Sequence, residues 1–465
     1  MRMERDSLGE KAVPADAYWG VQTQRAVENF PISGYRLPFH MIWAMAHIKK
    51  AAALVHKETG RLAPELADAI VAAADEVIAG RFNDHFVVDA FQAGAGTSFN
   101  MNTNEVIANR ANEILGQPRG QYRPIHPNDH VNMAQSTNDS FPTAMRLATL
   151  RALEGLYPVL DQVAATFERK AKEFWHVIKA GRTHLQDAMP VRLGQEFLAY
   201  SRIIQRGRRR LQEAAADLHE LGIGGTAVGS GVNAEKVYPT KVVEHLARLT
   251  GFPLRPGENL FALMQSLSDF SHVSGALRDL ALDISKIAND LRLLSSGPST
   301  GLAEIRLPAV QPGSSIMPGK VNPSMLEMLN QVCYRVVGND AGIAAATEAG
   351  QLELNVMMPV VAFMLLESIE ILKNALKATD ERTFQGIQAN EKRARELVEK
   401  SAALATALTD YIGYLKAAEI AKEVVETGRS LRDVVLEKGL LDEATLDKVL
   451  DYAAMTEPGV PGRSQ

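Results

Sequence analysis

The sequence predicts a mainly α-helical protein built around five long helices. The main observation is a repeated spacing of three and four residues between apolar side chains, which places them on one face of a helix. This spacing continues over many turns in the middle of the chain, whereas segments with the apolar and polar alternation of a strand are scarce. Such seams are typical of long helices that pack almost parallel in a bundle.

The longest apolar seam predicts a helix over residues 270–294. It consists of Phe270, Val273, Leu277, Leu280, Ile284, Ile287, Leu291 and Leu294. A second seam covers residues 150–167 and a third covers residues 197–221. Further helical stretches over residues 325–337 and 360–376 complete the five helices of the predicted bundle.

The segments on either side of the bundle differ from it in composition. Residues before 136 are expected to form shorter helices interrupted by Gly, Asn and Pro, and those after 392 are charged, with short amphipathic helices such as 417–426. We therefore predict an N-terminal mixed helical domain (1–135), a central helical bundle (136–392) and a small C-terminal helical domain (393–465). Seams of this kind suit packing between subunits as well as within one.

The charge balance excludes several classes of partner. The 465 residues include 50 basic and 55 acidic side chains, so no global basic excess points to nucleic acid or a membrane surface. The basic run at 202–210 lies in a helical pattern without interleaved aromatic residues, which favours a solvated or subunit-facing helix side. The longest apolar stretch, 356–366, is about half a membrane span and contains Pro359.

Cysteine usage and the N-terminal residues predict a cytoplasmic protein. Cys333 is the single cysteine, so no internal disulfide can form, and its neighbours indicate a buried helix. Residues 1–6 are charged from the second position and lack the apolar run of a secretory signal.

Four polar segments interrupt the apolar seams. They are 94–105 (GAGTSFNMNTNE), 126–139 (HPNDHVNMAQSTND), 181–190 (GRTHLQDAMP) and 312–323 (PGSSIMPGKVNP). Helix capping could explain the second segment taken alone, but the asparagines at 100, 102 and 104 in the first are hard to explain by capping alone. Together they supply many neutral donors and one obvious lysine, without a nucleophilic cysteine or paired carboxylates. That combination suits a small anion whose carboxylates are held by hydrogen bonds and one cation.

Two nucleotide-binding patterns fail on inspection. The segment 313–319 has five residues between its glycines instead of four, and Val321 replaces the Ser or Thr that a phosphate loop places after its lysine. Residues 222–227 (GIGGTA) fit a dinucleotide fingerprint, but they follow a predicted helix where the fingerprint requires a strand. A flexible loop at a bundle end is the better interpretation of 222–227, and we expect no cofactor.

A metal site is also disfavoured. His126, Asp129 and His130 match no common ligand spacing, and the surrounding amides and hydroxyls are poor zinc ligands. We therefore predict no metal.

The motif GSSIMPGKVNP at 313–323 resembles the signature loop of the fumarase/aspartase superfamily. The resemblance extends over essentially the whole chain, because five further motifs occur in family order, namely GAGTSFNMNTNE, HPNDHVN, QSTND, GRTHLQD and GQLELNV. It implies a three-domain fumarase/aspartase-like fold and a homotetramer whose central helices form a twenty-helix core. Each of the four active sites would draw on three subunits.

The resemblance also implies a reaction, reversible β-elimination that yields fumarate from a small dicarboxylate. A base removes a proton from the carbon beside one carboxylate, and the group on the next carbon then leaves. Because this removal places a second negative charge on the carboxylate, catalysis depends on donors aimed at the resulting aci-carboxylate.

Matching motif positions imply the roles of individual residues. Ser314 is the expected base, and its anion must be stabilised by backbone N–H groups and positive charge in a loop that closes over substrate. The donors to the aci-carboxylate would be Thr97, Ser136, Thr137 and Ser315. The second carboxylate would be held by Lys320, Asn322 and, from another subunit, Thr183.

Further positions would contact the leaving group or a separate anion. His184 is expected near the leaving group, paired with Glu327, and Asn138 is expected to contact the amino group of aspartate. His126, Asn128 and Asp129 correspond to a secondary anion site of the family.

The motifs favour aspartate ammonia-lyases, in which ammonia leaves, over class II fumarate hydratases, in which water leaves. Ala95, Thr137 and the Gly-Gln pair at 350–351 depart from the usual hydratase pattern. In the other direction, 126–129 has the hydratase form, and Ser299 and Met358 depart from the usual lyase pattern. The prediction is elimination of ammonia from L-aspartate, with hydration of fumarate as the alternative and a catalytically silent structural role as a remote one.

Overall fold

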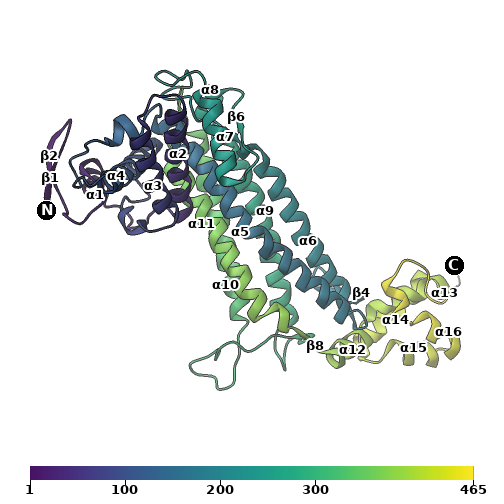
Figure 1. Cartoon of the computed structure of the whole chain (residues 1–465). Coiled ribbons are helices and arrows are strands. Elements are labelled where there is room, and N and C mark those ends of the chain that lie inside the picture. Colours follow the sequence, from purple (N-terminus) through teal and green to yellow (C-terminus); the bar gives the residue numbers. More distant parts are fainter. Residues whose placement is uncertain (464–465) are drawn as a thin grey trace. The chain divides into compact units, whose positions relative to one another are not determined.

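Five long helices dominate the computed structural model, which describes residues 1–463 (Figure 1). They are α5 (Thr137–Glu173), α6 (Leu193–Ala214), α9 (Ser268–Leu294), α10 (Ser324–Glu348) and α11 (Met358–Arg382). Each of the five predicted helical segments lies in one of them, wholly or in its greater part. The prediction of a mainly α fold around five long helices is therefore confirmed.

Burial explains why the apolar spacing identified these helices. All eight seam residues of α9 have a relative exposure of 7% or less. The third seam was less accurate, because α6 ends at Ala214 while Leu218 and Leu221 lie in a 3-10 turn and in strand β5 (Glu220–Leu221). Both leucines are still fully buried. Apolar spacing thus reports burial, and it continued past the point where the helix ends.

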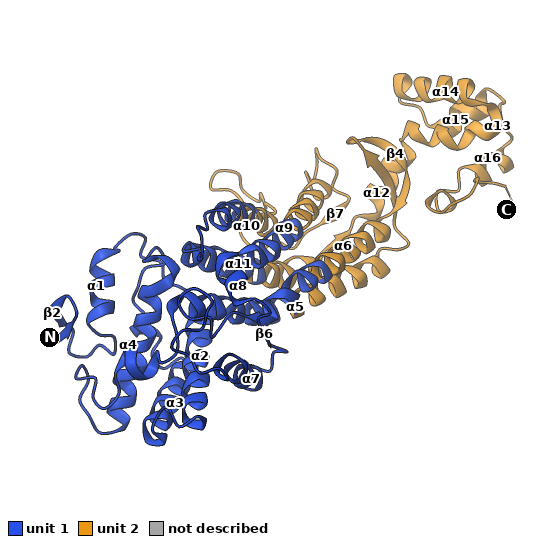
Figure 2. Ribbon diagram, turned by 90° about the horizontal axis from the view of Figure 1, so that it is seen from above, with its two compact units in different colours: residues 1–157, 209–281, 334–373 blue, residues 158–208, 282–333, 374–465 orange. Residues whose placement is uncertain are grey.

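The chain divides into two compact units, each made of three chain segments (Figure 2). Unit 1 contains residues 1–157, 209–281 and 334–373, and unit 2 contains residues 158–208, 282–333 and 374–465. Each long helix has residues in both units. The division into three domains at residues 135 and 392 stays a prediction.

Unit 1 contains six shorter helices, of which the first four lie in the N-terminal part, where shorter helices were predicted. They are α1 (Val21–Asn29), α2 (Phe39–Glu58), α3 (Pro64–Ile78), α4 (Thr97–Ile114), α7 (Tyr238–Thr250) and α8 (Leu260–Gln265). Helix α2 packs against α3 and α7, and α3 packs against α4. Buried hydrogen bonds join long helices in this unit, for example from Ser274 Oγ on α9 to Asp340 Oδ1 on α10 (2.6 Å).

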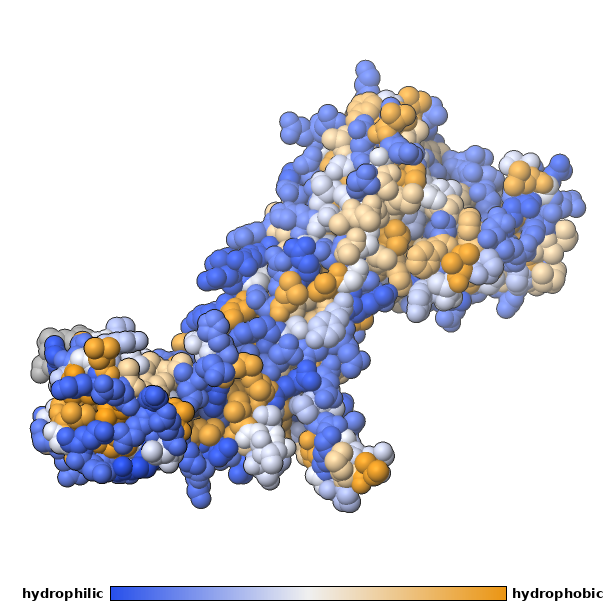
Figure 3. All heavy atoms as spheres, turned by 180° about the vertical axis from the view of Figure 1, so that it is seen from behind, coloured by the Kyte–Doolittle hydropathy of each residue, from blue (hydrophilic) through white to orange (hydrophobic). Residues whose placement is uncertain are grey.

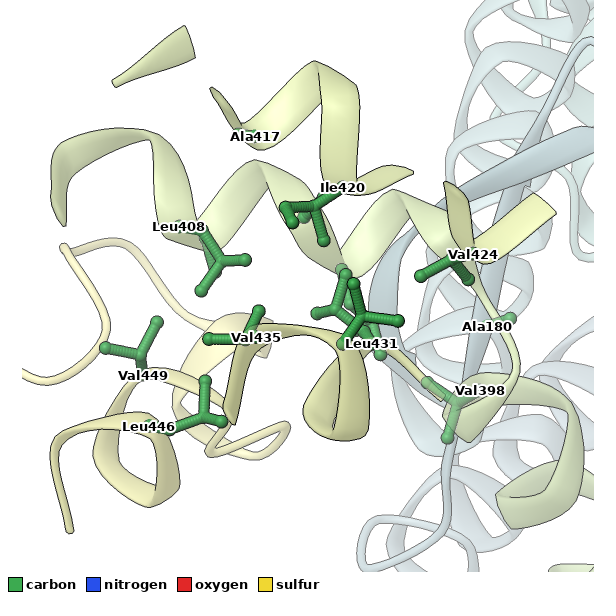
Figure 4. Packing of buried hydrophobic residues seen from close by; sticks show 14 residues of the cluster. Ala180, Val398, Leu408, Ala417, Ile420, Val424, Leu431, Val435, Leu446 and Val449 are labelled. Carbon is green, nitrogen blue, oxygen red and sulfur yellow. The ribbon is translucent and has the colours of Figure 1, made fainter. Parts of the chain in front are cut away.

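Unit 2 contains the C-terminal helices. They are α12 (Glu391–Glu399), α13 (Thr409–Ile412), α14 (Tyr414–Thr427), α15 (Leu431–Glu437) and α16 (Glu443–Val449). The helix expected over 417–426 lies within α14 and is confirmed. An apolar cluster that includes Leu408, Ile420, Leu431 and Val435 holds these helices together, and Ala180 from a distant part of the chain joins it (Figure 4).

Strands are few and occur as pairs, but two hairpins were missed by the sequence analysis. They are β1 (Arg2–Asp6) with β2 (Gly9–Val13), and β3 (Ile178–Thr183) with β4 (Gln186–Arg192). Strand β5 pairs in parallel with β6 (Arg255–Pro256), and β7 (Ile305–Arg306) pairs with β8 (Gln388–Ala389). The hairpins were missed because strands of five to seven residues, largely polar, show no sustained alternation.

The face shown in Figure 3 is mainly hydrophilic, with hydrophobic residues scattered over it. Large apolar side chains are exposed at several places in the described chain. Three of these lie on long helices, namely Leu282 and Leu293 on α9 and Tyr334 on α10, with exposures of 51%, 42% and 60%. Cys333 is buried in α10 as predicted, and burial raises the pKa of its thiol to about 12. Among the described residues, every helix is too short or too polar to span a lipid bilayer. The cytoplasmic location stays a prediction.

Candidate active site

The fourth polar segment, residues 312–323, forms a loop before α10 that we call the serine loop. Its base is closed by a hydrogen bond from Gly313 N–H to the Lys320 carbonyl (2.8 Å). Asn322 Nδ2 also donates to the Gly313 carbonyl (2.6 Å). A Cβ atom on Gly313 would lie 2.5 Å from the backbone nitrogen of Asn322, so glycine is required at this position.

Within the serine loop, Ser314 is half-buried and Ser315 and Lys320 are exposed. Ser314 Oγ accepts hydrogen bonds from the backbone N–H groups of Met317 (2.9 Å) and Ile316 (3.2 Å). Such bonds occur in ordinary serine turns. They also favour the anionic form of the hydroxyl, because two donors point at the atom that would carry the charge.

The third polar segment is the tip of the β3–β4 hairpin, between α5 and α6. His184 and Leu185 form the two-residue connection, with φ values of +54° and +60°. Positive φ at both positions is the geometry of a type I′ turn, which matches the twist of paired strands but is usually filled by Asn and Gly. Strained residues of this kind are concentrated at functional sites. Thr183 and His184 are both exposed.

The base of this hairpin is held by a buried carboxylate. Glu304 is fully buried, accepts a hydrogen bond from Arg182 Nη1 (2.9 Å) and lies 3.6 Å from Lys179 Nζ. Ala180 belongs to the apolar cluster of the C-terminal helices (Figure 4). The exposed tip therefore projects from a fixed base.

The expected partner of His184, Glu327, lies in the first turn of α10 and is half-buried. Within the described chain no hydrogen bond or ion pair joins the two side chains, and their pairing stays a prediction. Residues 185–187 line an open groove of about 760 Å³ together with residues of the segment 402–426, and the serine loop takes no part in this groove.

The first and second polar segments meet in unit 1, at the starts of α4 and α5. Gly96, with φ +80°, precedes α4, and a Cβ atom there would lie 2.2 Å from the ring of Phe141 on α5. Asn100 Nδ2 donates to Thr137 Oγ1 (3.0 Å), which links the two helices again. Thr97 is exposed, Ser136 and Asn138 are half-buried and Thr137 is 8% exposed.

The glycine-rich loop at residues 222–231 is bound to this region. Asp139 is fully buried and accepts backbone hydrogen bonds from Ser136 (2.9 Å), Thr226 (2.9 Å) and Gly224 (3.0 Å). Burial raises the pKa of Asp139 to about 7. Asn138 Nδ2 donates to the Ala227 carbonyl (2.8 Å). Side chains from the start of α5 thus hold the backbone of this loop, and its flexibility stays a prediction.

Lys49, a fully buried residue of α2, was not among the residues predicted from the sequence. Its Nζ donates to Asn100 Oδ1 (2.7 Å), Gln135 Oε1 (2.8 Å) and Asn132 Oδ1 (3.0 Å). Burial lowers the pKa of Lys49 to about 7, although the negative charge of Asp139 opposes this shift. The three oxygens match the three hydrogens of an ammonium group.

A signal for Lys49 was present in the sequence. It is four residues after Met45 and three before Ala52, both buried, so it falls on the apolar face of a helix. A lysine on such a face is almost never fully buried without partners. We call Lys49, Asn100, Asn132, Gln135 and Thr137 the Lys49 network.

Two of the predicted secondary anion residues, Asn128 and Asp129, lie in a short π-helical turn, Pro127–Val131, and His126 precedes this turn. His126 Nδ1 accepts the backbone N–H groups of Asn128 (3.2 Å) and Asp129 (3.3 Å), and it lies 3.5 Å from Asp129 Oδ2. Among residues 1–463, no three His, Cys, Asp or Glu side chains are placed to hold a metal ion. The anion site stays a prediction.

Two family models match the chain. One is described as Lyase and matches residues 9–338, and the other is described as Fumarase C C-terminus and matches residues 404–457. The aspartate ammonia-lyase of Bacillus subtilis (strain 168) is 52% identical over 462 residues, which cover 99% of this chain and 97% of the relative. The class II fumarate hydratase of Thermus aquaticus is 48% identical over 460 residues, 98% of each chain.

A solved structure agrees with these relatives over the same length. The fumarate lyase:delta crystallin of Brucella melitensis is 50% identical, covers 98% of this chain and 100% of its own, and superposes with a TM-score of 0.95. The motif order, the five-helix fold and the similarity over nearly the whole length all indicate the same family. The chain is therefore a lyase and belongs to the fumarase/aspartase superfamily.

Proposed function

We propose that the chain catalyses the reversible elimination of ammonia from L-aspartate to give fumarate. The observation that carries this proposal is the pair of backbone N–H groups on Ser314 Oγ, which favour its action as an alkoxide base. Ser314 takes the proton from the carbon beside one carboxylate. The carbon–nitrogen bond of the next carbon then breaks, its electron pair leaves with ammonia, and the double bond of fumarate forms.

The neutral donors of the polar segments bind the charge that develops in this step. In the proposal Thr97, Ser136, Thr137 and Ser315 donate to the aci-carboxylate. Lys320, Asn322 and Thr183 hold the other carboxylate. One amide hydrogen of Asn322 is used within the serine loop, which leaves its second hydrogen for substrate.

Asn138 supports an amine as the leaving group. Its amide nitrogen donates to the Ala227 carbonyl, and because a carbonyl only accepts, the amide must present its oxygen on the other side. A protonated amino group has donors only, so a free amide oxygen is a suitable partner for it. In the proposal His184, with Glu327, lies near the same group.

The active site is proposed to form in a homotetramer, with residues from three subunits at each site and a core of twenty helices. Two observations support an assembly: the hairpin tip with Thr183 and His184 is exposed, and apolar side chains are exposed on α9 and α10. Light scattering after gel filtration should then give four times the chain mass of 50.7 kDa.

Hydration of fumarate is the second candidate. It is favoured by the 126–129 motif and by the similarity to the Thermus aquaticus enzyme. Purified protein should be assayed with L-aspartate and with L-malate side by side, by the ultraviolet absorbance of fumarate. Faster turnover of L-aspartate supports the proposal, and faster turnover of L-malate would replace it by the hydratase. No fumarate from either substrate would leave only the silent structural role.

A further inference from the structure

The ammonium group of Lys49 is connected to the hydroxyl of Thr137 through one side chain. Lys49 Nζ donates to Asn100 Oδ1 (2.7 Å), and Asn100 Nδ2 donates to Thr137 Oγ1 (3.0 Å). The three residues have exposures of 0%, 1% and 8%. Hydrogen bonds in such a buried chain polarise one another, because the local dielectric constant is low.

The backbone fixes two of the three amides around Lys49. Gln135 Nε2 donates to the carbonyls of Val131 (3.1 Å) and Met133 (3.2 Å), and Asn132 Nδ2 donates to the Gln135 carbonyl (3.2 Å). Since carbonyl oxygens only accept, these nitrogens must face the backbone and both amide oxygens must face Lys49.

Asn100 differs because, among residues 1–463, its amide nitrogen donates only to side chains. Its oxygen faces the ammonium group of Lys49, which in this protonated form only donates, and its nitrogen therefore faces Thr137 and Asn132 Oδ1 (3.2 Å). Without the charge on Lys49, only the bond to Asn132 Oδ1 (3.2 Å) would oppose a turn of the amide oxygen toward Thr137.

The direction of this bond decides what the Thr137 hydroxyl can do. Because Oγ1 accepts a hydrogen from Asn100, its own proton must point elsewhere. Within residues 1–463 this proton has no acceptor. If Asn100 were turned, the hydroxyl would donate to the amide oxygen instead and would be lost as a donor to substrate.

We propose that Lys49 is a positioning residue of the active site: by holding Asn100, it keeps the Thr137 hydroxyl directed as a donor to the aci-carboxylate. This inference rests on the proposed function of Thr137. The competing explanation is that Lys49 only stabilises the packing of α2 against α4 and α5.

The first test uses Asn100→Asp, which keeps the size of the side chain and adds a charge opposite to that of Lys49. A carboxylate has no hydrogen to give, so the Thr137 hydroxyl must donate to it. We expect kcat for fumarate formation to fall about 100-fold, as for loss of an oxyanion donor, with KM changed by less than about threefold. Wild-type kcat in a folded Asn100→Asp variant would overturn the inference.

The second test is a double-mutant cycle between Lys49→Met and Thr137→Val. We expect Lys49→Met to lower kcat about thirtyfold in the wild-type background and less than about threefold when Thr137→Val is already present. A merely structural role of Lys49 predicts the same loss in both backgrounds, and that result would overturn the inference.

Lys170→Met is the matched control, since Lys170 is another buried lysine and its Nζ donates to the Ile387 carbonyl (2.8 Å). Its effect on kcat should be the same with and without Thr137→Val. If Lys49→Met does not fold, Asn100→Asp decides the question alone. A wild-type protein that turns over neither L-aspartate nor L-malate would overturn the proposed function and this inference together, whereas an active wild type with an additive cycle would overturn the inference only.

Discussion

The serine loop and the Lys49 network contribute opposite kinds of structure to the proposed reaction. Most of the loop is exposed, and its hydrogen bonds are made within the loop itself. In the network, Lys49, Asn100 and Thr137 are buried and bonded to side chains from other elements. The base therefore comes from a segment with few tertiary contacts, and one proposed donor comes from a segment with many.

The difference teaches where each part of the chemistry is prepared. Donors that are already oriented need no reorganisation when charge develops, so burial of the network favours electrostatic stabilisation. A segment with few buried contacts opens and closes at low free-energy cost, which suits a loop that must admit and release substrate. Removal of a side chain from the loop should therefore change turnover with little change in stability, whereas substitutions in the buried region should change stability.

The largest effect is expected for Ser314→Ala. Loss of the base should lower kcat by roughly three powers of ten, while the free energy of unfolding changes by less than about 1 kcal/mol because the lost bonds are local and half-exposed. Steady-state kinetics and urea unfolding measure the two quantities. Near-normal turnover would assign the base to another residue, and a large loss of stability would remove the contrast drawn above.

Two glycines with nearly equal φ angles give a matched comparison. Gly96 has φ +80° and Gly319 in the serine loop has φ +79°, yet a Cβ atom would overlap the Phe141 ring at Gly96 and meets nothing within 4 Å at Gly319. Gly319→Ala should cost about 1–2 kcal/mol from the left-handed conformation alone. Gly96→Ala should cost at least about 2 kcal/mol more. Equal losses in urea unfolding would contradict tight packing between α4 and α5.

Glu105 should make stability depend on pH. It is fully buried on α4 and accepts the backbone N–H groups of Gly20, Gln22 and Thr23 at the start of α1, and burial raises its pKa from 4.5 to about 7. The folded protein then binds this proton more tightly than the unfolded chain does. Its contribution to the free energy of unfolding is therefore full below pH 4.5, falls as pH rises to about 7, and is constant above that.

The matched variant is Glu105→Gln, which does not titrate. Relative to that of the variant, the free energy of unfolding of the wild type should fall by up to about 3 kcal/mol from pH 4.5 to pH 7. Glu4 and Tyr122, which are bonded to each other, remain in both proteins. Urea midpoints at pH 5 and pH 8 measure the effect, and a difference independent of pH would contradict it.

The smallest effect is expected at Cys333. The thiol is buried in α10 and its pKa is raised to about 12, so very little of the reactive thiolate exists at neutral pH. Native protein treated with a thiol reagent should keep full activity and show no modified cysteine by mass spectrometry, whereas protein in urea should be modified. Rapid labelling of the native protein would show that this part of α10 opens.

Local pattern was sufficient for the helices and for the serine loop. Residues such as Leu277 and Ile287 repeat at helical spacing because one face of α9 is buried, and that repetition is visible without coordinates. The GSSIMPGKVNP motif is contiguous, so Ser314, Lys320 and Asn322 could be placed together in one loop. The polar segment with His184 was identified between the second and third seams, but its strands are too short to be recognised as a hairpin.

Contacts between distant segments were decided only by the tertiary structure. Lys49 meets Asn100 and Gln135 across 51 and 86 residues, and Asp139 holds Gly224 across 85 residues. A hydrogen bond depends on the position and direction of both partners, and spacing along the chain contains neither once the partners belong to different elements. The sequence by itself determined which apolar residues are buried along the long helices and which loop carries the serine. The folded chain decided which polar groups face one another, because only packing of the helices fixes the distance and orientation that a hydrogen bond requires.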